Sequence, residues 1–175
     1  MMALPNGVSV TRLDMHRDDR GVFTEVFRRE WRLGIDPVQW NAVSSEAGVL
    51  RGVHVHPRHD DYLILLRGQA AIGLKDLRQG SATQGLPALV ELEADNMAGI
   101  LIPHGVAHGF YFHEPSIHLY AVSHCWDPAD EKACLWSDPA LGIPWPVATA
   151  RVSDRDAGAQ PLSRLLDELE SEQPI

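Results

Sequence analysis

The chain has 175 residues, of which 45% are hydrophobic and 22% charged, and its net charge at pH 7 is −9. This length and composition fit one globular domain with a sizeable core, and the acidic balance argues against a protein that binds the phosphate backbone of nucleic acids. The two cysteines, Cys125 and Cys134, are too few for a disulfide scaffold and predict reduced thiols.

The N-terminal residues contain neither a basic start leading into an apolar stretch nor a small-residue cleavage site. No apolar run approaches the ~20 residues that are needed to cross a bilayer. We therefore expect a cytoplasmic protein without a membrane partner.

Short segments of alternating or apolar residues recur between turn signals along most of the chain. They cover residues 8–13, 22–27, 38–44, 49–56, 62–66, 70–76, 89–92, 99–102, 107–112 and 118–124. Because short strands separated by glycine and proline turns are typical of barrels and sandwiches, the sequence predicts an all-β fold.

The end of the chain has a helical pattern instead. Leu162, Leu165, Leu166 and Leu169 recur at helical intervals, which predicts a short C-terminal helix packed on the barrel. No linker or internal repeat divides the sequence. We expect a single domain over residues 1–175, with its core at about 8–146 and a C-terminal segment, 147–175, packing on the barrel.

The strongest functional signal lies in two histidine-containing segments at the centre of the chain. His54 and His56 are two residues apart, so both side chains project from the same face of an extended strand. Asp61 follows, Gly68 stands where a hairpin turn is needed, and His108 comes later, after a Pro-x-Gly turn. This order resembles the cupin signature, and the resemblance implies a cupin-type jelly-roll β-barrel.

Beyond that signature, the chain resembles the dTDP-4-dehydrorhamnose 3,5-epimerase family from about Asp18 to Leu162. Several separate motifs occur in the family's order. They are 19–25 (DRGVFTE), 39–45 (QWNAVSS), 50–54 (LRGVH), 76–81 (DLRQGS), 103–110 (PHGVAHGF), 119–120 (LY), 136–139 (WSDP), 143–146 (IPWP) and 152–156 (VSDRD).

This resemblance implies an epimerase of nucleotide-linked 4-keto-6-deoxy sugars that acts as a homodimer and needs no cofactor. His54 would remove a proton beside the keto group, Asp156 would hold and charge that histidine, and Tyr120 would return a proton from the other side. A histidine backed by a carboxylate is fixed in one tautomer and made more basic, which suits proton abstraction near neutral pH.

The same resemblance implies a set of substrate-binding residues. Arg20 and Arg51 would bind the diphosphate, because a guanidinium group binds phosphate oxygens in pairs. The aromatic plane of Trp126 would stack on the nucleotide base. The remaining residues predicted to line the nucleotide and sugar are Phe23, Glu25, Gln39, Asn41 and His108.

One position departs from the family pattern. Counted back from Gly68, the family's enolate-stabilising lysine falls on Asp61, and a carboxylate there would oppose a developing enolate. In one explanation, other donors such as His108 or a protonated His56 stabilise the enolate.

In a second explanation, the protein is a metal-dependent cupin. Three imidazoles and one carboxylate suit one divalent transition metal, and the predicted ligands are His54, His56, Asp61 and His108. A third alternative is a non-catalytic relative that binds nucleotide sugars.

Overall fold

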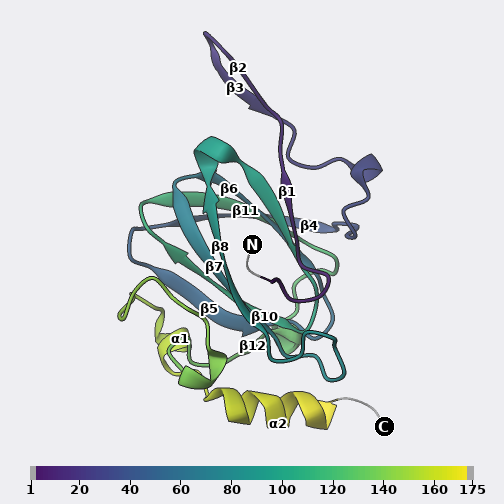
Figure 1. The fold of residues 1–175 in the computed structure, drawn as a ribbon, viewed down its shortest axis with the longest axis vertical. Coiled ribbons are helices and arrows are strands. Elements are labelled where there is room, and N and C mark those ends of the chain that lie inside the picture. Colours follow the sequence, from purple (N-terminus) through teal and green to yellow (C-terminus); the bar gives the residue numbers. More distant parts are fainter. Residues whose placement is uncertain (1–2, 173–175) are drawn as a thin grey trace.

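Two five-stranded antiparallel sheets face one another in the computed structural model, which describes residues 3–172 (Figure 1). The first sheet has the order β1 (Ser9–Arg12), β9 (Ala98–Ile102), β6 (Asp61–Arg67), β11 (Ser116–Val122) and β4 (Gln39–Ser45). The second has the order β12 (Lys132–Ala133), β5 (Leu50–Val55), β10 (Val106–Phe112), β7 (Gln69–Asp76) and β8 (Pro87–Glu93). This is the double-sheet arrangement of a jelly roll, so the predicted all-β fold is confirmed.

Short elements decorate the two sheets. A separate hairpin is formed by β2 (Met15–Asp18) and β3 (Gly21–Thr24), and it projects away from the barrel (Figure 1). The helices are η1 (Arg29–Trp31), η2 (Ala94–Asn96), η3 (Pro128–Asp130), η4 (Pro139–Leu141), α1 (Asp154–Ala157) and α2 (Leu162–Glu172). None of these helices is long and apolar enough to cross a membrane.

Each predicted strand segment coincides with an observed strand, and the differences have physical causes. The strand expected at 22–27 ends at Thr24, because Val26 and Phe27 leave the hairpin and pack on the outer face of the first sheet. Two strands escaped prediction: β2, whose residues are mostly exposed and polar, and β12, which has only two residues.

The main core lies between the two sheets. It includes Leu63 and Leu65 of β6, Ile100 of β9, Ile72 of β7 and Phe112 of β10, all at most 1% exposed. Because alternate residues of a strand point to opposite faces, Tyr62 and Ile64 of β6 point outward, where the N-terminal segment covers them. Both faces of the first half of β6 are therefore buried.

Gly68 forms a tight turn between β6 and β7, but the hairpin expected there is not formed, because the two strands lie in different sheets. The φ of Gly68, +87°, favours glycine, and a Cβ added there would collide with Ser116 Oγ. The turn carries the chain from the first sheet, where β6 begins at Asp61, into the second.

The C-terminal helix expected from the sequence is present as α2 and packs on the outer face of the second sheet. Leu162 and Leu165 of α2 are buried with Val53 and Val55 of β5, whereas Leu166 is 36% exposed. Before α2, the short helix α1 packs beside β5 and carries Asp156.

We predict that Leu165→Ala lowers the free energy of unfolding by about 2–5 kcal/mol, because it leaves a cavity beneath α2. Leu166→Ala, the matched control on the exposed side of the same helix, is expected to cost about 1 kcal/mol or less. Urea denaturation of the two variants measures the difference, and equal losses would contradict the packing of α2 described here.

Candidate active site

A cavity of about 440 Å³ opens between the two sheets. Its walls contain Asn41, Asp61 and Tyr120 from the first sheet, and His54 and His108 from the second. The wall is completed by residues 151–153, 155 and 156 of the C-terminal segment. The cavity therefore has His54 on one side and Tyr120 on the other.

The predicted pair of His54 and Asp156 is present in the wall of this cavity. His54 Nε2 lies 2.9 Å from Asp156 Oδ1, and the backbone N–H of Gly52 donates to Asp156 Oδ2 at 3.3 Å. Ser153 caps α1 by accepting the backbone N–H of Asp156 at 3.1 Å, which positions the carboxylate beside β5.

The ionised form of Asp156 sets the tautomer of His54. Burial by itself raises the pKa of Asp156, but the hydrogen bond from His54 and the donors around it lower that pKa below its ordinary value overall. An ionised carboxylate only accepts hydrogen bonds, so His54 Nε2 carries the proton. The lone pair of the ring is then on Nδ1.

Glu131 faces this second nitrogen. Its Oε1 lies 3.6 Å from His54 Nδ1, too far for a hydrogen bond but close enough to stabilise a positive charge on the ring. Arg155 donates to Oε1 at 3.1 Å, and the indole N–H of Trp126 donates to Oε2 at 2.7 Å. The sequence motifs did not single out Glu131, since it follows the short helix η3 in a loop without periodic pattern.

Tyr120 lies in the opposite sheet, on β11, and lines the same cavity. Burial raises the pKa of its hydroxyl, and the negative charges of Asp61 and Glu131 raise it further. The hydroxyl is therefore protonated at neutral pH and able to give a proton.

Several predicted substrate-binding residues gather around the cavity mouth. Asn41 lines it, and its buried amide nitrogen has no hydrogen-bond partner among the described residues. Gln39 donates to Asn41 Oδ1 at 2.9 Å and accepts the backbone N–H of Trp126 at 3.0 Å. The side chain of Trp126 is 53% exposed at the rim, where a planar ligand can stack on it.

Arginines contribute positive charge to the cavity wall. Arg51 lines it and is held by Ser45 Oγ, which accepts from Nε at 2.9 Å. Arg151 and Arg155, which the sequence motifs did not assign to the substrate, line it as well. These guanidinium groups bring positive charge to the cavity of a protein whose net charge is −9.

Arg20, Phe23 and Glu25 lie elsewhere. Arg20 and Phe23 belong to the hairpin region, where Arg20 pairs with Asp18 and Phe23 is 65% exposed. Glu25 pairs with Arg28. None of the three lines the cavity of its own chain.

The structure separates the histidines that the alternative metal set had combined. His54 is bonded to Asp156, whereas His56, His59 and Asp61 form a different group whose potential ligand atoms lie within 4.8 Å of one another. His108 also faces Asp61, with Nε2 3.8 Å from Oδ2. The metal-ligand set predicted from the sequence thus contains His54, which is bonded to Asp156 instead, and omits His59.

One sheet of the barrel presents a histidine that is hydrogen-bonded to a carboxylate, and the other presents a tyrosine. These two groups can transfer protons. A sequence profile of the dTDP-4-dehydrorhamnose 3,5-epimerase family matches residues 3–164. The chain belongs to this family of isomerases, so the resemblance seen in the motifs and the predicted class of activity are confirmed.

Individual relatives agree with this assignment. The chain is 35% identical over 144 residues to the spore coat polysaccharide biosynthesis protein SpsL of Bacillus subtilis, covering 80% of this chain and 95% of that protein. It is 34% identical over 152 residues to a dTDP-4-dehydrorhamnose 3,5-epimerase of Shigella flexneri, covering 82% and 84% respectively.

Among solved structures, an epimerase of Legionella pneumophila in complex with dTDP-4-keto-L-rhamnose is similar to this chain with a TM-score of 0.88. The two sequences are 31% identical, and the match covers 97% of this chain and 95% of that one. The cupin-type barrel expected from the sequence is thereby confirmed.

His118, a buried histidine in the cavity wall, generates a pH prediction. Burial, together with the charge of Arg51, lowers its pKa to about 4. In the unfolded chain this histidine has a pKa of ~6.5. Below that pH the unfolded chain binds a proton that the folded chain does not bind. Stability is therefore lost as the pH falls from ~6.5 towards the folded pKa, by at most about 1.4 kcal/mol per pH unit for this residue.

His118→Phe, which keeps an aromatic ring beside Phe112, is expected to reduce this pH dependence. Urea denaturation at about pH 5 and about pH 7 measures the slope in both proteins. An unchanged slope would show that His118 is protonated equally in the folded and unfolded states.

Proposed function

We propose that the protein inverts carbons next to the keto group of a nucleotide-activated 4-keto-6-deoxy sugar, with His54 as the base. The observation that carries the proposal is the His54–Asp156 hydrogen bond, placed across the cavity from Tyr120 in a member of this epimerase family. A keto group acidifies the hydrogens on its neighbouring carbons, which makes proton removal by an imidazole feasible.

His54 Nδ1 is the atom that takes the proton in this scheme, because Nε2 donates to Asp156. The imidazolium that results is flanked by two carboxylates, Asp156 at 2.9 Å from Nε2 and Glu131 at 3.6 Å from Nδ1. Both stabilise its positive charge, and general-base catalysis of this kind contributes about 10²–10⁴-fold to a rate.

Tyr120 returns a proton to the opposite face of the sugar. Inversion requires that the proton leave one face and arrive at the other, and the two groups come from opposite sheets, β5 and β11. The reaction is redox-neutral overall, so it needs no redox cofactor.

Binding of the nucleotide is assigned to the cavity rim. Arg51 meets the diphosphate, Trp126 stacks on the base, and the unpaired amide of Asn41 donates to the sugar or the nucleotide. The name of the Bacillus relative supports a role in supplying a surface polysaccharide. The free thiols Cys125 and Cys134 support the cytoplasm as the compartment.

Solvent exchange tests the proposal and separates the two proton-transfer residues. We expect wild-type protein incubated with dTDP-4-keto-6-deoxyglucose in deuterium oxide to place deuterium beside the keto group. His54→Ala should slow this exchange by about 10²–10⁴-fold. Tyr120→Phe should still exchange, because the base can return deuterium to the face it came from, while inverted product falls roughly 100-fold or more.

Mass spectrometry and proton NMR follow deuterium entry and product configuration in the same samples. His113→Ala, a histidine paired with Glu91 outside the cavity, is the matched control and should behave as wild type. A sugar nucleotide that binds tightly but never exchanges would contradict the proposal and favour a non-catalytic binding protein.

We further infer a homodimer in which the β2–β3 hairpin of one protomer reaches the cavity of its partner. The hairpin projects from its own barrel (Figure 1) and exposes Phe23 and Val22, at 65% and 48%. Arg20 and Phe23, which the family resemblance assigns to the nucleotide, lie on this hairpin and outside the chain's own cavity. A second copy would both cover the apolar residues and receive these ligand contacts.

Mixed dimers test this arrangement. Arg20→Ala/Phe23→Ala should raise KM, and His54→Ala should abolish turnover, but co-expression of the two should restore one site of low KM in each mixed dimer. In the control pair, His54→Ala with Asp156→Ala, the cavity of each protomer carries one defect, so no intact site forms and nothing should be restored. A monomer in sedimentation analysis, or no restoration in the first pair, would contradict the inference.

A further inference from the structure

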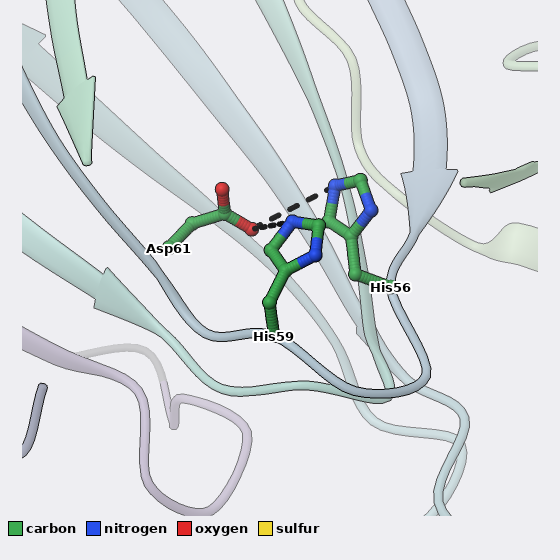
Figure 2. Close-up of side chains that lie close together, drawn as sticks. All are labelled: His56, His59 and Asp61. Carbon is green, nitrogen blue, oxygen red and sulfur yellow. Dashed lines mark ion pairs between the residues drawn. The ribbon is translucent and has the colours of Figure 1, made fainter. Parts of the chain in front are cut away.

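Three histidines converge on one carboxylate at the inner end of the cavity. Asp61 Oδ2 lies 3.7 Å from His56 Nε2, 3.8 Å from His59 Nε2 and 3.8 Å from His108 Nε2. Figure 2 shows the carboxylate facing the rings of His56 and His59, which stack with centroids 3.9 Å apart. All four side chains are at most 8% exposed.

The opposite nitrogen of each ring faces an oxygen of the protein. His59 Nδ1 lies 2.7 Å from Asp130 Oδ2, His108 Nδ1 lies 3.1 Å from the carbonyl of Val106, and His56 Nδ1 lies 3.4 Å from the carbonyl of Asp130. A carbonyl or an ionised carboxylate only accepts, so each Nδ1 carries the ring proton. The Nε2 atoms of the three rings therefore all face Asp61.

This arrangement places hydrogen-bond acceptors opposite one another. Separations of 3.7–3.8 Å are too long for hydrogen bonds within the group. A proton on Asp61 would satisfy at most one ring, whereas a cation at the centre would satisfy all four side chains.

We propose that His56, His59, His108 and Asp61 bind one divalent first-row transition ion. Imidazole nitrogen with one carboxylate oxygen is a common ligand set for such ions, and hydrogen bonds on the far nitrogens are the usual means of orienting histidine ligands. A tetrahedral ion with bonds of ~2.0–2.1 Å keeps its ligand atoms roughly 3.4 Å apart. The separations of 3.7–3.8 Å between Asp61 and the three imidazoles would contract by a few tenths of an ångström. His108 would also move towards the other two histidines, because only the ligand atoms of His56, His59 and Asp61 all lie within 4.8 Å of one another.

This ligand set differs from the one that the sequence spacing suggested, because His59 takes the place of His54. The substitution removes a conflict of roles. His54 remains bonded to Asp156 and free of metal, while the ion occupies a separate group in the same cavity.

Resting on the proposed function, we assign the ion the task of placing positive charge beside the keto oxygen, which it would reach as an electrophile by expanding to a fifth ligand. The two lysines of the chain do not line the cavity: Lys75 donates to the carbonyls of Gly85 and Leu141, and Lys132 pairs with Glu168. Asp61 stands where the family resemblance places a lysine. A divalent ion held by Asp61 would supply positive charge at that point.

Cobalt(II) titration of chelator-treated protein tests the site without reference to activity. We expect one ion per chain and the visible absorption bands of cobalt bound by nitrogen ligands. His59→Ala should weaken binding roughly 100-fold or more, and Asp61→Asn, which preserves shape, should do the same in a protein whose folding is checked by circular dichroism. His54→Ala and His113→Ala should retain the ion.

The proposed site would be overturned if wild-type protein bound no cobalt in the titration and contained no zinc, iron(II), nickel or manganese by elemental analysis. Loss of cobalt in His54→Ala with retention in His59→Ala would overturn the ligand assignment. Deuterium exchange that is equal with and without metal would overturn the electrophilic role. Exchange absent from both forms would contradict the proposed function, and with it that role, while the cobalt spectrum would still support the site.

Discussion

The hydrogen bond between His54 and Asp156 is the constraint on which the rest of the site depends. It joins a strand of the barrel to the C-terminal segment across 102 positions of sequence. The bond keeps a buried carboxylate ionised, and the ionised carboxylate in turn fixes the ring so that Nδ1 faces the cavity. Glu131, which accepts hydrogen bonds from Arg155 and Trp126, lies beside the imidazole whose orientation this bond determines.

Strand geometry explains why neighbouring histidines have different environments. His54 lies within β5, beside α1, whereas His56 follows the end of β5 and turns towards the start of β6, where Asp61 stands. Two carboxylates on different elements, Asp156 and Asp61, therefore face two different sets of histidines in one cavity. A proton acceptor and a group of ligand atoms can coexist there because neither set shares a residue with the other.

Periodicity predicted ten of the twelve strands of the described residues and the helix α2, since each of these has a local pattern of apolar residues. Asp156 and Tyr120 could be assigned only through motif resemblance, because no local pattern shows that residues so distant in sequence share a cavity. Glu131 and His59 were missed because they lie in loops, where side-chain direction depends on the surrounding fold. Sequence also could not place the hairpin bearing Phe23, whose position relative to a cavity depends on tertiary structure.

The location of Asp156 beyond the last strand has a consequence for the protein's synthesis. All twelve strands of the described residues are synthesised before residue 156 is added, since β12 ends at Ala133 and α1 begins at Asp154. A nascent chain therefore contains His54 long before it contains the carboxylate that pairs with it. Proteolytic cleavage before Ser153 would remove α2 from the outer face of the second sheet and leave the imidazole without that carboxylate.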